Sequence, residues 1–210
     1  MTDALGYRVT VLLFDGVEEL DAIGPWETLR FWQVLTKRDV VVRTASIDGR
    51  PVRCGMGLMV TPDGAVDDGS RPDLLVHPGG AGTDLLRADQ GHLSRLRSLA
   101  AGGTLLASVC NGSLVLAAAG LLDGLPATSH WGVLDELASR YPGVDVRTGQ
   151  RWVDAGHIVT SAGVSAGIDM ALHLVDRLED AEMARSVAHA MEYPWSPQTP
   201  VTTPVGNGEA

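Results

Sequence analysis

Apolar runs alternate with amphipathic segments along most of the chain. Residues 7–14 (YRVTVLLF) are β-branched and aliphatic with little alternation, which is typical of a central strand covered on both faces. Further strands are predicted at 39–47, 74–77, 103–109, 145–151 and 152–160, with a hairpin at 49–61.

Helical spacing of apolar residues lies between these strands. Helices are predicted at 22–32, 85–101, after Cys110, at 133–140 and after Gly167, where Met170, Leu174 and Leu178 form an apolar face. Strands that alternate with helices in this way favour an α/β fold: a mostly parallel sheet with helices on both faces.

Size and composition indicate one domain. The chain has 210 residues, 45% of them hydrophobic, which suits a single core over residues 1–192. Residues 193–210 are rich in Pro and polar side chains and predict an extended or partly disordered arm.

The net negative charge of the chain limits the kinds of partner that it is expected to bind. A net charge of −10 and a pI of about 4.9 argue against a nucleic-acid or anionic-membrane surface, so a small-molecule substrate is expected. We find no apolar run of about 18 residues and no signal-peptide pattern, which predicts a cytoplasmic protein with Cys54 and Cys110 as thiols. The six histidines are scattered, and no metal site is predicted.

Cys110 lies at a strand-to-helix joint. Such a turn resembles in outline the nucleophile elbow of hydrolases, and the helix N-terminus favours thiolate, so we expect a thiol pKa below its usual value of about 8.5. A small buried cysteine used for packing explains the same pattern. Cys54 lies in the hairpin, where nothing nearby would activate it.

Two further segments end at the same edge as Cys110. Ligands of parallel sheets bind at the carboxyl ends of the strands, and Asp21 and the Gly79-Gly80 turn each follow a predicted strand there. Asp21 alone also suits a helix cap or first turn, and the PGGAG segment alone suits a plain turn. The glycine spacing matches neither a dinucleotide loop nor a phosphate loop, so no cofactor is indicated.

Longer motifs carry a resemblance to a known family. They are FDGVEELDAIGPWETL at 14–29, PGG at 78–80, ASVCNGSLVLAAAGLLDG at 107–124, ATSHW at 127–131, TSAGVSAGIDMALHLV at 160–175 and MEYPWSPQTP at 191–200. With these motifs the chain resembles the DJ-1/PfpI superfamily, and within it the isonitrile hydratase group. The resemblance implies a flavodoxin-like three-layer sandwich, a homodimer, Cys110 as nucleophile, Asp21 as its acidic partner, and no metal or organic cofactor.

The residue after the nucleophile departs from the family pattern. Asn111 stands where the resembling hydratases usually have threonine and the peptidase-like members have histidine. Without that histidine the arrangement for peptide hydrolysis is incomplete. The Asn111 side chain carries a donor and an acceptor, so it orients water or substrate differently from a hydroxyl.

The resulting hypothesis is hydration of isonitriles. Cys110 attacks the terminal carbon, and Asp21, its pKa raised by burial beside the sulfur, shares a proton with the thiol. The backbone amides of Gly80 and Asn111 are expected to hold an oxygen or a water, and Gly79, His130 and Trp131 are expected near the pocket.

Three alternatives stay open at this point. The same cysteine suits a DJ-1-like glyoxalase or deglycase acting on α-oxoaldehydes, or a redox sensor oxidised at sulfur. The fold also serves as the sensing half of AraC-type regulators. That alternative is disfavoured because both Cys110 and Asp21 are present and no helix-turn-helix follows in this sequence.

Overall fold

The computed structural model describes residues 6–67, 69 and 71–196. Its main sheet has seven strands, and each hydrogen-bonded pair of neighbours is parallel except for the first two in the order. The order is β10 (Trp152–Asp154), β11 (Ile158–Ser161), β7 (Leu105–Val109), β6 (Leu74–His77), β1 (Tyr7–Leu13), β2 (Val40–Ser46) and β5 (Gly64–Ala65).

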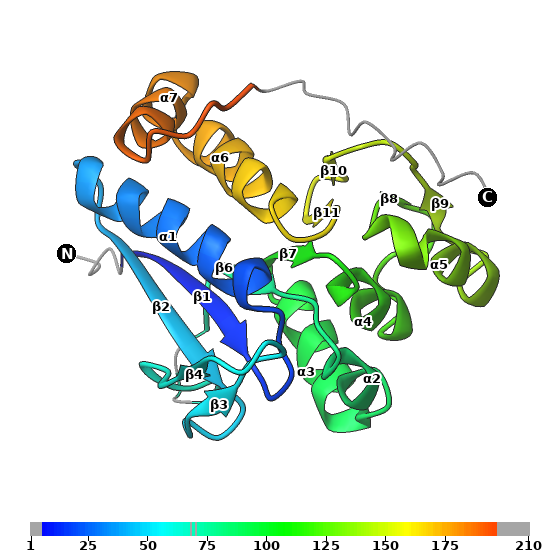
Figure 1. The fold of residues 1–210 in the computed structure, drawn as a ribbon. Coiled ribbons are helices and arrows are strands. Elements are labelled where there is room, and N and C mark those ends of the chain that lie inside the picture. The colour runs from blue at the N-terminus through cyan, green and yellow to red at the C-terminus, as the bar shows by residue number, and fades with distance from the viewer. Residues whose placement is uncertain (1–5, 68, 70, 197–210) are drawn as a thin grey trace, which may run out of the picture.

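Helices cover both faces of this sheet, as Figure 1 shows. One face carries α1 (Glu19–Leu35), α6 (Ala166–Leu178) and α7 (Ala181–Ala190). The other carries α2 (Thr83–Leu86), α3 (Gln90–Ala101) and α4 (Gly112–Ala118), with the 3₁₀ turn η1 (Trp131–Val133) and α5 (Leu134–Arg140) beyond them. The predicted three-layer α/β sandwich with a mostly parallel sheet is confirmed.

Two small strand pairs lie outside the main sheet. β3 (Val52–Arg53) and β4 (Met59–Val60) form the antiparallel hairpin expected at 49–61. β8 (Pro126–Ala127) and β9 (Asp145–Val146) pair in parallel. In the part of the chain that the structure describes, no helix is both long and apolar enough to cross a membrane.

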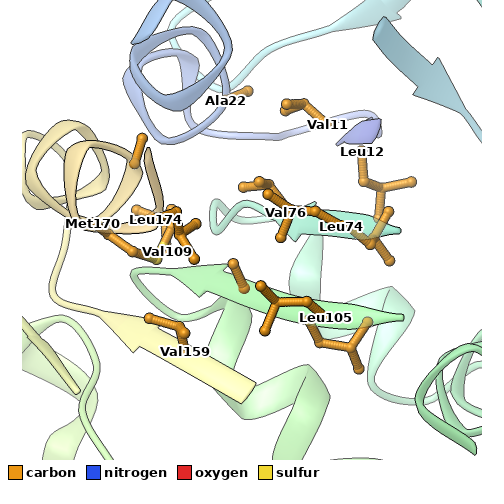
Figure 2. Close-up of a cluster of buried hydrophobic side chains, with 14 of the residues drawn as sticks. Val11, Leu12, Ala22, Leu74, Val76, Leu105, Val109, Val159, Met170 and Leu174 are labelled. Carbon is orange, nitrogen blue, oxygen red and sulfur yellow. The ribbon is translucent and has the colours of Figure 1, made fainter. Parts of the chain in front are cut away.

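The core explains why the central strands are almost continuously apolar. Every residue of β6, β7 and β11 is buried, because helices cover both of their faces. Figure 2 shows Val76 and Val109 of the sheet beside Met170 and Leu174 of α6. This packing fixes the strand ends from which the functional residues project.

The structure differs from the predicted helices in three places. The segment 85–101 is two helices, because the Asp89 side chain accepts hydrogen bonds from the Gly91 and His92 amides and starts α3 anew. Helix α1 begins at Glu19, so Asp21 lies in its first turn. Helix α7 was not predicted, and it packs on α1 and α6.

The first residues of the predicted C-terminal arm pack against the domain. The Tyr193 hydroxyl donates to the Asp169 carboxylate at 3.2 Å, and Trp195 packs on the core. Tyr193 and Trp195, at the start of the predicted arm 193–210, thus pack on the folded domain. Residues 197–210 of the predicted arm lie outside the described part of the chain.

Candidate active site

Cys110 occupies a strained turn between β7 and α4. Its φ of +57° lies in the left-handed region, which costs a non-glycine residue about 1–2 kcal/mol. Its N–H lies 3.2 Å from the Ser161 carbonyl oxygen and 3.3 Å from that of Ala162, and its own carbonyl accepts from the Ser129 hydroxyl at 2.8 Å. The backbone is therefore held on both sides, and the predicted elbow is present.

The strain at Cys110 predicts an unusual mutational result. Glycine adopts a positive φ without the Cβ penalty, so Cys110→Gly should be more stable than Cys110→Ala by about 0.5–1 kcal/mol after allowing for glycine's extra unfolded-state entropy. Urea unfolding of the two variants measures this difference. An alanine variant that is the more stable of the two would contradict the strained turn.

Asp21 reaches the elbow from the first turn of α1. Its side chain is fully buried, and it binds outside its own helix. Oδ2 accepts from the Gly79 amide at 3.1 Å, Oδ1 accepts from the Val164 amide at 2.9 Å, and the Cys110 thiol also hydrogen-bonds to the carboxylate. Asp21 therefore lies beside Cys110 and does not cap its own helix.

Gly79 must be small because three site residues converge on it. A Cβ built there would lie 2.4 Å from Asn111 Oδ1, 2.7 Å from Asp21 Oδ2 and 2.8 Å from the Cys110 Cβ. The Gly79 carbonyl also accepts from the Glu18 amide at 2.9 Å, which ties this loop to the start of α1. The structure thus brings Cys110, Asp21, Asn111 and Gly79 together.

Burial raises the pKa of both partners. The pKa of Asp21 rises to about 6 because burial outweighs the hydrogen bonds from Val164, Gly79 and Cys110. The pKa of the Cys110 thiol rises to about 12, first through burial and second through the Asp21 charge. With one pKa near 6 and the other near 12, the pair holds one proton at neutral pH.

This result corrects the expectation of a thiol pKa below its usual value. The Asn111 amide does hydrogen-bond to the sulfur and lowers its pKa, as a helix N-terminus should. Burial and the neighbouring carboxylate raise it by more.

Asn111 and Gly80 form a closed pair. The Gly80 N–H donates to Asn111 Oδ1 at 2.8 Å, and Asn111 Nδ2 donates to the Gly80 carbonyl at 3.2 Å. The Gly80 amide is thus occupied by a side chain, which differs from the expectation that it holds a substrate oxygen. The backbone N–H of Asn111, in contrast, hydrogen-bonds to the sulfur of Cys110.

His130 lies beside Cys110 across Gly163. A Cβ built on Gly163 would lie 2.2 Å from His130 Cδ2 and 3.3 Å from the Cys110 sulfur. His130 Nδ1 accepts from the Gly132 amide at 3.2 Å, which places the proton of the neutral ring on Nε2, and burial lowers the pKa of the imidazole. Trp131 is 66% exposed.

A cavity of about 250 Å³ adjoins the elbow through these residues. Its walls include Ser129, His130, Trp131, Gly163 and Val164, as expected for His130 and Trp131. A larger cavity of about 380 Å³ lies at the ends of β1 and β2. Its lining contains neither His130 nor Gly163, the residues next to the Cys110 sulfur, so the 250 Å³ cavity is the candidate site.

Val164 is the site residue that the sequence reasoning missed. It has a φ of +57°, and its amide is one of the two backbone donors to Asp21. The segment 162–165 follows β11 at the same sheet edge as Cys110, so the rule that located Asp21 and Gly79 applied to it as well.

These features define a class: an α/β protein with a cysteine at a strained strand-to-helix turn and a buried carboxylate hydrogen-bonded to it. The family model that describes the DJ-1/PfpI family matches residues 7–177. The chain belongs to the DJ-1/PfpI family.

Similar proteins fall into several functional groups. An isonitrile hydratase of Pseudomonas putida is 36% identical over 95% of this chain and 86% of its own length. The HTH-type transcriptional regulator GbdR of Pseudomonas aeruginosa is 33% identical over 87% of this chain, which spans 49% of the regulator. The crystal structure of Drosophila melanogaster DJ-1beta superposes with a TM-score of 0.81 at 25% identity, over 90% of this chain and 100% of that one.

Proposed function

We propose that the protein is an enzyme that hydrates isonitriles to N-substituted formamides. The observation that carries the proposal is the partly buried Cys110 hydrogen-bonded to the fully buried Asp21, one proton between them, beside a small cavity. The 36% identity to an isonitrile hydratase over nearly the whole chain supports this substrate class.

The first step adds the thiol across the terminal carbon of R–N≡C. As the sulfur attacks that carbon, Asp21 takes the thiol proton and delivers it to the same carbon, which gives the thioimidate R–N=CH–S–Cys110. A carboxylate with a pKa of about 6 is ionised at neutral pH and is therefore ready to accept this proton. No free thiolate needs to accumulate beforehand.

The second step hydrolyses the thioimidate. Asp21 accepts a proton from water as the oxygen adds to the carbon and passes that proton to the nitrogen, which gives R–NH–CH(OH)–S–Cys110 and leaves Asp21 ionised again. The C–S bond then breaks, the hydroxyl proton returns through Asp21 to the sulfur, and R–NH–CHO leaves. One water is consumed, and both side chains regain their starting states.

The neighbouring groups support distinct parts of this scheme. The Asn111 amide next to the sulfur stabilises negative charge that develops there during attack and departure. The neutral His130 ring and the exposed Trp131 form a partly apolar wall for the R group. The homodimer implied by the family resemblance and the cytoplasmic location stay predictions.

The proposal predicts product formation by the unaltered protein. Incubation with cyclohexyl or p-nitrophenyl isocyanide should yield the corresponding formamide, and NMR measures its formation. Cys54→Ser is the matched control: Cys54 is buried in the hairpin and its pKa is raised by burial and nearby carboxylates, so this variant should retain the activity.

The same assay, run with methylglyoxal, distinguishes the hydratase from the main alternative, a glyoxalase. Methylglyoxal should give no lactate under these conditions. Lactate without formamide would replace the hydratase by a glyoxalase reaction, in which the thiol adds to an aldehyde carbon. A raised thiol pKa speaks against a redox sensor, because oxidation at sulfur follows thiolate character.

A further inference from the structure

Two buried histidines lie beneath the loop that contacts Asp21. His77 is the last residue of β6 and His92 lies in the first turn of α3; they are 1% and 2% exposed. Their Nε2 atoms are 3.0 Å apart. The reaction scheme uses neither ring.

The contacts of His77 fix the proton positions in both rings. His77 Nδ1 lies 2.9 Å from the Pro78 carbonyl oxygen, which only accepts, so Nδ1 carries the proton. In a neutral imidazole the other nitrogen then accepts, and His77 Nε2 receives the Nε2–H of His92. Burial keeps both rings neutral, since it lowers the pKa of His77 to about 3 and that of His92 to about 4.

The Pro78–Gly79 peptide connects this pair to the active site. The Pro78 carbonyl and the Gly79 N–H belong to one planar unit, and they point in opposite directions across it. The carbonyl accepts from His77, while the N–H donates to Asp21 Oδ2 at 3.1 Å. A continuous chain of hydrogen bonds thus runs from His92 through His77 and this peptide to Asp21.

The surroundings hold the same peptide plane in place. A Cβ built on Gly112, in the first turn of α4, would lie 2.7 Å from the Pro78 oxygen, so the helix closely approaches this carbonyl. The Phe14 ring packs on His77 with centroids 5.8 Å apart. His77 is the side-chain donor to the carbonyl in this arrangement.

We propose that His77 and His92 are positioning residues that orient the Pro78–Gly79 peptide so that its N–H stabilises the Asp21 carboxylate. The inference rests on the role of Asp21 in the proposed function. No proton needs to travel along the chain, because the histidines act by fixing the peptide plane and by polarising its N–H.

Removing the His77 donor should change the ionisation of Asp21. The Gly79 bond favours the charged carboxylate, so weakening it raises the pKa of Asp21. The charged and titratable groups that act on Asp21 are Cys110 and Glu18, and those that act on His92 are Arg95 and Asp89. None of these is altered by a substitution at His77.

The test follows alkylation of Cys110 by iodoacetamide against pH in a Cys54→Ser background. Alkylation should speed up as pH rises through the pKa of Asp21, near 6 in the unaltered protein, and we call this rise the lower limb of the profile. In His77→Phe, the lower limb should move to a pH about 0.5–1 unit higher. His77→Asn, whose side-chain amide can replace Nδ1–H, should restore the original limb. Phe14→Leu removes packing around His77 but keeps the donor, so its profile should match that of the unaltered protein.

An unshifted limb in folded His77→Phe would overturn the proposal, and so would an equal shift in Phe14→Leu. If His77→Phe does not fold, nitrogen NMR of the unaltered protein tests the proposed hydrogen-bond chain instead. His77 should carry its proton on Nδ1 and His92 should carry its proton on Nε2 from about pH 5 to about pH 8. A His77 proton on Nε2 would overturn it as well. Neither measurement uses an isonitrile, so missing formamide would refute the proposed function, whereas a shifted limb would still support the positioning role.

Discussion

Cys110→Ala should lose at least about 10⁴-fold in kcat/KM for isonitrile hydration, because the sulfur forms the covalent bond that both steps use. The fold should survive, since alanine keeps the same backbone geometry and removes only the buried thiol beside Asp21. Formamide release measured by NMR, with circular dichroism as the check on folding, gives the result.

Cys54→Ser is the matched control for this substitution. Both positions lose one thiol, but Cys54 lies in the hairpin loop between β3 and β4 and makes its backbone contact with Leu58 rather than with the site. Activity that survives in Cys110→Ala would remove the covalent mechanism even if isonitriles are the substrates.

Asp21→Asn should lower kcat/KM by about 10²–10⁴-fold, the usual contribution of a well-placed acid or base. The pH profile carries a sharper expectation. In the unaltered protein the rate should rise as pH increases through about 6, because Asp21 must be ionised to accept the thiol proton. In Asp21→Asn this limb should disappear, since the amide does not titrate.

Glu18→Gln is the control for this pH dependence. The Glu18 charge raises the pKa of Asp21, so its removal should move the limb slightly toward lower pH while the activity is kept. Stopped assays across the pH range measure both variants. A limb near pH 6 that persists unchanged in Asp21→Asn would assign it to another group and contradict the role of Asp21.

The raised pKa of Cys110 changes how the nucleophile works. A helix N-terminus alone predicts a stabilised thiolate, and the Asn111 amide supplies that contact. The sulfur, however, is partly buried and lies against a carboxylate, and two adjacent negative charges are costly there. Under the proposed function, attack with concerted proton transfer to Asp21 is therefore expected.

Local sequence determined much of the fold. The nearly continuous apolar runs of β1, β6 and β7 indicate strands covered on both faces, and the alternation of strands with helices indicates a parallel sheet. Helix boundaries were less well predicted, because the Asp89 cap that starts α3 competes with a helical apolar spacing that continues through it.

The sequence by itself determined which residues follow the strands at one sheet edge, and so which of them could meet: Asp21, Gly79 and Cys110. Tertiary structure decided their chemistry. Ionisation of the pair depends on burial and on the Gly79 and Val164 amides, and the Gly80 amide is taken by the Asn111 side chain. These contacts join residues up to 143 positions apart, and neither periodicity nor local spacing encodes burial or distance at that range.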